Sequence, residues 1–234
     1  MNESLQTVYP GAASSSVALE QRHRVLRNTY WLLALSLVPT VLGAWLGVST
    51  GFMSRMGTGM SVLVFFGGAF GLMYAIEKTK ESAAGVAVLL GFTFFMGLML
   101  SRLLAGILGS YTNGASLIML AFGGTAAVFF AMATVATLIK RDLSGMSQFL
   151  YVGAVVIIVA SLLNIFLIQS SAMMLAISVL VIGLFSAFMV FDIKRVLDGG
   201  ETNYITATLH IYLDLYNVFQ ALLSILGFAG GSRD

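Results

Sequence analysis

The sequence predicts an all-α membrane protein with seven transmembrane helices. Hydrophobic residues make up 59% of the 234 residues and charged residues only 9%, whereas a soluble domain usually carries about 25% charged residues. The apolar residues gather in long runs, and a helix needs roughly 20 apolar residues to cross a hydrocarbon core about 30 Å thick. The connections between the runs are short, so we expect one compact bundle rather than two domains.

A polar segment, residues 1–27, precedes the first apolar run. It has glycine and serine in its first half and a basic cluster at residues 22–27. This composition predicts a disordered cytoplasmic tail. A cleavable signal peptide is not expected, because the apolar run that follows is too long for the apolar region of such a peptide. Residues 28–234 are expected to form the transmembrane domain.

Seven apolar runs make up this domain. We expect helices over residues 30–49, 60–76, 84–108, 116–138, 149–169, 173–192 and 205–228. The first contains Pro39, which removes a backbone hydrogen bond and is expected to kink the helix. The second run is the shortest, and the third is long enough to tilt. Only Gln169, Ser170 and Ser171 separate the fifth run from the sixth, so that boundary is the least defined.

Lysine and arginine are distributed unevenly over the predicted loops. With the N-terminus in the cytoplasm, nine of them fall on the cytoplasmic side: Arg22, Arg24, Arg27, Lys78, Lys80, Lys140, Arg141, Lys194 and Arg195. The other side receives only Arg55 and Arg233, and Arg102 lies within the third run. Because cytoplasmic loops carry an excess of basic residues, this bias predicts a cytoplasmic N-terminus and an external C-terminus. Basic residues scattered over short loops do not indicate a nucleic-acid surface.

The chain has 25 glycines, many of them within the runs. Examples are Gly67, Gly68 and Gly71 in the second run, and Gly123 and Gly124 in the fourth. Small residues let membrane helices approach closely, so we expect these glycines to serve packing. A phosphate-binding loop would require a GK[ST] ending, and the sequence contains none.

Two acids stand at membrane depth on consecutive runs. Asp214 is nine residues into the last run, which at 1.5 Å per residue places it about 13 Å from the cytoplasmic start of that helix. Asp192 ends the preceding run. Charged side chains in membrane helices usually face the bundle interior and serve ion or proton movement. Two close carboxylates in a low dielectric tend to share one proton, so this pair is the predicted pH-sensing and ion-gating site. The alternative for Asp192 is an interfacial ion pair with Lys194 or Arg195.

Other polar residues within the runs have more than one interpretation. His210 stands four residues before Asp214, on one helical face, where it would relay protons; the alternative is a solvated histidine near the interface. Tyr216 is a packing group or a hydrogen-bond partner of an acid. Arg102 is expected to extend to the outer interface, with a gating contact as the alternative. Asn164 is expected to form an interhelical hydrogen bond.

The sequence argues against an enzyme. Cysteine is absent, which excludes disulfides, thiol catalysis and thiolate metal sites. Neither histidine stands in a nucleophile–base arrangement. Intramembrane aspartyl proteases also use two acids on adjacent helices, but they carry Gly-x-Gly-Asp at the second acid and a Pro-Ala-Leu segment beyond it. Here Asp214 follows Ile211-Tyr212-Leu213, and Pro-Ala-Leu does not occur.

Several blocks of sequence resemble a known family. Residues 199–205, GGETNYI, are followed by Leu215-Tyr216-Asn217 and by residues 222–228, LLSILGF. These blocks resemble the C-terminal signature of the Bax inhibitor-1 family, in its bacterial YccA-like branch. The motifs VLRNTY, at 25–30, and GGTA, at 123–126, resemble the same branch. The resemblance runs from about residue 22 to the C-terminus.

The resemblance implies a seven-helix fold in which the last helix is central. It also implies an aspartate pair on the last two helices that senses pH and gates a calcium leak. Asp192 and Asp214 match these two positions, so they are expected to contact calcium transiently as the permeant ion; no resident cofactor is expected. A further implied role is modulation of the membrane protease FtsH, as a poor substrate, in the bacterial inner membrane. That role depends on the N-terminal tail and need not exclude a leak.

Two positions depart from the family pattern. Many members have Gly-Pro where this chain has Ser101-Arg102. In bacterial members with the leak, an arginine of the second helix pairs with the two acids, but residues 60–76 contain no arginine. Lys78 or Lys80 is the nearest substitute.

Overall fold

The computed structural model describes the backbone of residues 10–230 and the side chains of residues 20–230. Every regular element in this range is helical. The elements are α1 (Pro10–Thr50), α2 (Phe52–Arg55), α3 (Thr58–Thr79), α4 (Ala83–Ser110), α5 (Gly114–Leu138), the 3₁₀ turn η1 (Ser144–Met146), α6 (Ser147–Leu163), the π-helical turn η2 (Asn164–Ile168), α7 (Ser171–Asp198) and α8 (Tyr204–Gly230). Seven helical segments, with η1, α6 and η2 counted as one, are long and apolar enough to cross a membrane. This confirms the predicted fold class.

The helices coincide with the predicted runs and extend past several of them. α7 continues beyond residue 192 to Asp198, where Gly199, at φ 80°, ends the helix. α1 begins at Pro10, so the structure has a helix over residues 10–27, where the composition predicts a disordered tail. The first nine residues of that tail lie outside the described residues. Composition therefore marks the apolar cores of the helices but not their ends.

The boundary between the fifth and sixth runs is closed by Asn164. Its side chain bonds both polar groups of one backbone residue: Oδ1 accepts from Ser170 N at 2.9 Å, and Nδ2 donates to Ser170 O at 3.2 Å. Gln169 lies between them in the left-handed region, at φ 52°. Asn164 thus stabilises the turn between η2 and α7, and the predicted interhelical hydrogen bond is formed at the turn and not in the middle of the helices.

α1 and α4 form the closest and most extensive helix pair. A Cβ added at Gly43 would lie 2.1 Å from the carbonyl oxygen of Phe94, and one added at Gly97 would lie 2.0 Å from that of Thr40. Gly43 and Gly47 form a G-x-x-x-G spacing, the pattern that brings membrane helices into backbone contact. Here glycine is required by close approach.

The glycines named from the sequence serve packing only in part. A Cβ at Gly68 would collide with the ring of Phe95, and one at Gly124 would touch Leu222 at 3.3 Å. Gly67, Gly71 and Gly123 face open space, with no atom within 4 Å of an added Cβ. For these three the packing prediction is wrong, because clustering of glycines does not reveal which side of a helix meets a neighbour.

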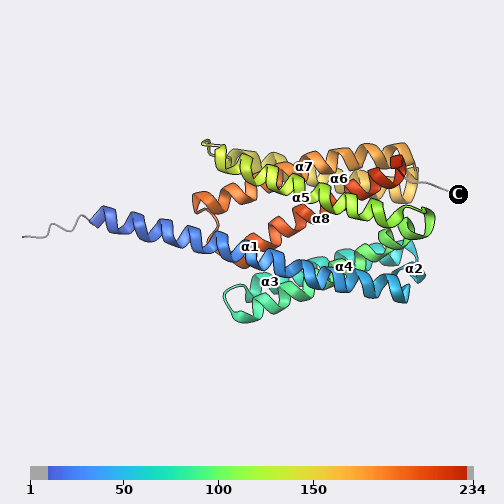
Figure 1. The fold of residues 1–234 in the computed structure, drawn as a ribbon, viewed down its shortest axis with the longest axis horizontal. Coiled ribbons are helices and arrows are strands. Elements are labelled where there is room, and N and C mark those ends of the chain that lie inside the picture. The colour runs from blue at the N-terminus through green and yellow to red at the C-terminus, as the bar shows by residue number, and fades with distance from the viewer. Residues whose placement is uncertain (1–9, 231–234) are drawn as a thin grey trace, which may run out of the picture.

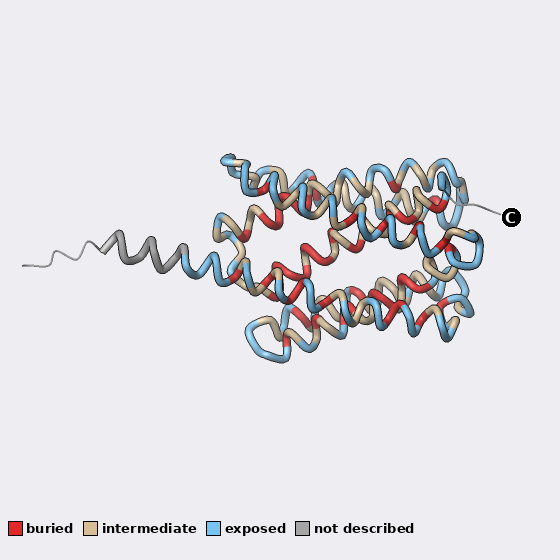
Figure 2. The backbone as a smooth tube through the Cα atoms, in the orientation of Figure 1, coloured by how far each residue is buried: buried red, intermediate tan, exposed pale blue. Residues whose placement is uncertain are grey.

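α8 crosses between two groups of helices, α1, α3 and α4 on one side and α5, α6 and α7 on the other (Figure 1). It packs against α7, α5, α1 and α4 and reaches α3. Its most apolar stretch is 44% buried, the largest share of the seven spans. Buried residues accordingly follow α8 along its length (Figure 2). Side chains projecting from α8 therefore enter the interior of the bundle.

Candidate functional site

A short, well-ordered connection places α7 and α8 beside each other as antiparallel neighbours. After Gly199 ends α7, Gly200 N donates to the carbonyl of Arg195 at 2.8 Å. Asn203 then caps α8, because its Oδ1 accepts from Ile205 N at 2.9 Å and from Thr206 N at 3.1 Å. The Asn203 amide also donates to the carbonyl of Lys80 at 2.9 Å, which ties this connection to the loop between α3 and α4. Residues shortly before and after the connection come to similar depth.

Asp192 on α7 and Asp214 on α8 meet across this helix pair. Their carboxyl groups lie within hydrogen-bonding reach of each other. Both are buried, with residue exposures of 7% and 3%, and Oδ2 of Asp214 has no hydrogen-bond partner among residues 20–230. A hydrogen bond between two carboxyl groups requires that one of them carries a proton, and two charged carboxylates would repel in this low dielectric. The structure thus brings the two predicted acids together in an arrangement that can hold a proton between them.

His210 contacts the acid on the neighbouring helix. Its Nδ1 lies 3.7 Å from Oδ1 of Asp192, and its side chain is 32% exposed. This is an ion-pair distance and longer than a hydrogen bond. The sequence spacing pointed instead to Asp214, one turn away on the same helix. The contact with Asp192 links the buried pair to a partly solvated group.

The other charged neighbours of Asp192 are Arg195 and Glu201, which both act on it electrostatically. Arg195 Nη2 lies 3.6 Å from Oε2 of Glu201, and Lys194 Nζ lies 2.5 Å from Oδ1 of Asp198. Within residues 20–230, neither cation therefore forms an ion pair with Asp192, and the alternative interpretation of Asp192 is wrong. Arg195, which follows Asp192 at i+3 on one helical face, is one of the two partners that the sequence offered for Asp192, whereas Glu201 is not.

The predicted auxiliary residues Lys78 and Lys80 lie away from the pair. Lys80 Nζ donates to Oε1 of Glu77 at 2.6 Å, and this hydrogen bond raises the pKa of Lys80 above its ordinary value, against a smaller effect of burial. Lys78 Nζ lies over the ring of Tyr74, 5.5 Å from its centroid. No ion pair among the described side chains joins either lysine to Asp192 or Asp214, so neither takes the place of the second-helix arginine that the family resemblance led us to expect beside the two acids.

Tyr216 and Tyr212 hold α8 in place. The hydroxyl of Tyr216 donates to the carbonyl of Met96 on α4 at 3.1 Å, and that of Tyr212 pairs with the hydroxyl of Thr40 on α1 at 2.9 Å. Of the two interpretations of Tyr216, the structure has the packing group, which is buried and bonds a backbone carbonyl rather than an acid. Buried tyrosine hydroxyls need a partner, and here backbone and hydroxyl oxygens of α4 and α1 supply it.

Arg102 is also an anchor. Its Nη1 donates to Ser61 Oγ at 3.0 Å and its Nη2 to Thr58 Oγ1 at 3.3 Å. Both acceptors lie at the start of α3. The exposed guanidinium therefore ties α4 to the first turn of α3 at one end of the bundle, and no contact in the described structure connects it to the acids.

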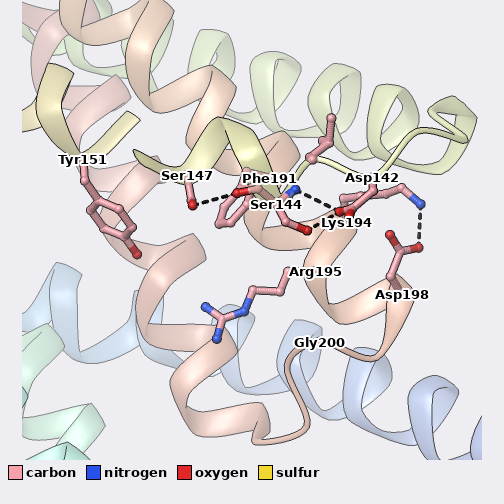
Figure 3. Close-up of a pocket in the computed structure, with 10 residues that line it drawn as sticks. Asp142, Ser144, Ser147, Tyr151, Phe191, Lys194, Arg195, Asp198 and Gly200 are labelled. Carbon is pink, nitrogen blue, oxygen red and sulfur yellow. Dashed lines mark hydrogen bonds and ion pairs between the residues drawn. The ribbon is translucent and has the colours of Figure 1, made fainter. Parts of the chain in front are cut away.

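A cavity of about 360 Å³ lies where α6 begins and α7 ends (Figure 3). Its lining includes Tyr151 and Arg195, and Tyr151 lies close enough to both aspartates to interact with their charge. Asp142 stands at its edge, where Ser144 donates from both its hydroxyl and its backbone N–H. These bonds hold the pKa of Asp142 below its ordinary value. Sequence reasoning missed this cavity, because its residues come from two segments, 142–151 and 191–200, that are far apart in the chain.

Comparison with known proteins identifies the family. Residues 22–231 match the family described as inhibitor of apoptosis-promoting Bax1. The chain is 38% identical over 217 residues to a protein of Escherichia coli K12 named modulator of FtsH protease YccA, covering 93% of this chain and 94% of that protein. An E. coli O6:H1 protein named inner membrane protein YccA shows the same identity and coverage. An uncharacterised membrane protein of Vibrio cholerae is 37% identical over 211 residues, covering 88% of this chain and 90% of its own.

These matches span nearly the whole chain and include the C-terminal blocks from which the resemblance was inferred. The chain therefore belongs to the Bax inhibitor-1 family, and the predicted YccA-like resemblance is confirmed.

Proposed function

We propose that this protein is a pH-sensitive calcium leak whose gate is the Asp192–Asp214 pair. The observation that supports the proposal most directly is the contact between two buried carboxyl groups on the last two long helices. Acids buried in membrane helices commonly serve ion or proton movement. Membership of the Bax inhibitor-1 family supports the same function.

The gate works through the number of protons on the pair. With one proton, the two carboxyls share a hydrogen bond that holds α7 against α8. With none, two negative charges repel at close range, which loosens the contact and offers oxygen ligands of the kind that calcium prefers. Calcium and protons therefore compete for the same oxygens, and calcium flux rises as the pair loses its shared proton.

His210 and Arg195 adjust this equilibrium. Arg195 lies near Asp192 and favours its ionised form, and His210 has the same effect when it carries a proton. Glu201, which also acts on Asp192, opposes them. In the described structure the charge that acts on Asp214 is that of Asp192, and Asp214 is the more deeply buried of the two, so we assign the shared proton to Asp214.

The experiment is calcium flux into liposomes that contain the purified protein and a calcium-sensitive dye. Flux is recorded over a series of external pH values, with protein-free liposomes and a second, unrelated membrane protein as controls. The proposal requires flux above both controls and a steep change with pH. Flux equal to that of the controls at every pH would rule out the leak.

We infer a second function, modulation of the protease FtsH. It rests on the name of the E. coli relative, which is 38% identical to this chain, and on the polar composition of residues 1–27. A polar N-terminal segment gives a membrane-bound protease a place to begin degradation, while a tightly packed helix bundle resists extraction from the membrane. The protein would then be degraded slowly and delay other substrates. Both functions place it in the bacterial inner membrane with a cytoplasmic N-terminus.

Deleting residues 2–18 tests this second function. The truncated protein should escape slow degradation by FtsH and no longer delay other substrates. Asp214→Asn with the tail intact is the matched control and should be degraded like the wild type, which separates this function from the leak. A truncated protein that is still degraded at the wild-type rate would show that the tail has no such role.

A further inference from the structure

The cavity between α6 and α7 lies at the level where two apolar spans end. One span begins at Ser144 and the other ends at Asp198, and both residues line the cavity. Residues Ser147 and Tyr151, from the first turns of α6, line it as well. The most apolar stretch of this segment is only 6% buried within the protein, so the helix faces lipid. A cavity on a lipid-facing helix at the end of its span lies where phospholipid headgroups are found.

The charges in the cavity are balanced and separated. Its lining carries two cations, Lys194 and Arg195, and two carboxylates, Asp142 and Asp198. Figure 3 shows Lys194 gathered with both carboxylates at one side, while the guanidinium of Arg195 lies apart from them. A lining without net charge does not favour an anionic headgroup. Separated positive and negative groups complement a headgroup that itself carries one charge of each sign.

Arg195 is the group suited to a phosphate. Its partner in the described part of the chain, Glu201, stands 3.6 Å away, beyond hydrogen-bond length, so its N–H donors are available. The planar guanidinium presents those donors in a fork that matches phosphate oxygens. Lys194 is already bonded to Asp198 at 2.5 Å.

The two carboxylates are suited to an ammonium group. The hydrogen bonds from Ser144 both go to Oδ1 of Asp142, and the bond from Lys194 goes to Oδ1 of Asp198. The Oδ2 atom of each is left to accept from a further donor. A primary ammonium donates three hydrogen bonds, whereas a trimethylammonium donates none.

From this arrangement we infer that the cavity binds a zwitterionic phospholipid headgroup with a primary ammonium, the headgroup of phosphatidylethanolamine. Arg195 holds the phosphate, and Asp142 and Asp198 accept from the ammonium. Tyr151, Leu143 and Phe191 supply the apolar side of the cavity, where the glycerol and first chain carbons lie. The site shares Arg195 with the surroundings of the proposed calcium gate, but lipid binding is measured without calcium flux, so failure of one proposal is distinguishable from failure of the other.

The test is native mass spectrometry of the purified protein with short-chain phosphatidylethanolamine, phosphatidylcholine or phosphatidylglycerol. The primary ammonium adds a charge-assisted hydrogen bond, so phosphatidylethanolamine should bind at least about tenfold more tightly than either other lipid. Equal binding of phosphatidylcholine would overturn the recognition of the ammonium. Equal or tighter binding of phosphatidylglycerol would overturn the recognition of a zwitterion.

Variants and a soluble competitor complete the test. Arg195→Gln should weaken binding of phosphatidylethanolamine about tenfold, and Asp198→Asn should remove the preference over phosphatidylcholine. Arg55→Gln, the same change at an exposed arginine of α2, should leave binding unchanged.

Each variant is compared only if it elutes from gel filtration like the wild type, and Asp198→Asn gives an independent result if Arg195→Gln does not fold. Unchanged binding in both folded variants, or displacement of the lipid by an equal concentration of phosphoethanolamine, would overturn the proposal.

Discussion

Nδ1 of His210 lies 3.7 Å from Oδ1 of Asp192 on the neighbouring helix, although His210 stands one turn from Asp214 on its own. The three side chains form a short series from the partly exposed His210 to Asp192 and then to the buried Asp214. His210 is thus the partly exposed end of this series, and we predict that it relays protons between the solvent and the aspartate pair.

Replacing His210 should shift the pH response of the leak. A protonated histidine favours the ionised form of Asp192, so His210→Gln makes loss of the shared proton harder. The pH of half-maximal calcium flux should rise by about 1 pH unit, which corresponds to ~1.4 kcal/mol of charge interaction. His23→Gln, at an exposed position near the N-terminal end of α1, is the matched control and should keep the wild-type midpoint. An unchanged midpoint in His210→Gln would contradict the link.

The α1–α4 contact should tolerate no side chain at Gly97. Gly97→Ala places a Cβ 2.0 Å from the carbonyl oxygen of Thr40, and overpacking of this kind costs about 1–3 kcal/mol. Thermal unfolding in detergent should show a lower Tm. On the same helix Gly91 has no atom within 4 Å of an added Cβ, so Gly91→Ala should be neutral or gain up to about 1 kcal/mol of helix propensity. Equal Tm values for the two variants would show that the contact is looser than described.

Ser144→Ala should raise the pKa of Asp142. The Ser144 hydroxyl and then its backbone N–H lower that pKa, and the substitution removes the first of these bonds. Because the folded pKa lies below the unfolded value, the contribution to stability is present above the unfolded pKa and is lost as pH falls through the folded pKa. NMR titration of the labelled Asp142 carboxyl in micelles measures the shift. Ser147→Ala, which removes a bond to a backbone carbonyl only, should leave the pKa where it is.

The topology is tested by reporter fusions at both termini. The basic residues of the predicted loops favour one side by nine to two, which places the N-terminus in the cytoplasm and, with seven spans, the C-terminus outside. A reporter active only outside the cytoplasm should give signal at the C-terminus and none at the N-terminus. A cytoplasmic C-terminus would contradict this orientation.

The seven spans could be predicted because the length of an apolar run is a direct consequence of the bilayer thickness. The ends of the helices could not. α7 continues through residues 194–198, three of which are charged, until Gly199 adopts a positive φ, and composition does not reveal this. The helix over residues 10–27 could not be predicted either, because the backbone hydrogen bonds of a helix do not require apolar side chains.

The aspartate pair could also be predicted, since a short connection makes consecutive spans antiparallel neighbours. Its surroundings could not. The spacing of His210 and Asp214 predicts only which residues share a face of α8. The contact of His210 with Asp192 depends on how α8 is rotated against α7. Likewise, Lys78 and Lys80 are the cations nearest in sequence to the second run, which lacks the expected arginine, but local partners, Tyr74 and Glu77, hold both side chains.

The most direct test of the gate is the pH dependence of calcium flux in Asp214→Asn liposomes. Asparagine keeps the shape of the side chain and removes its titration, so flux should become nearly independent of pH, and Asp192→Asn should flatten the response in part. Glu77→Gln, at an exposed acid of α3, should keep the wild-type profile. If Asp214→Asn and Asp192→Asn both retain the flux and the pH response of the wild type, the pair is structural and the proposed gate is wrong.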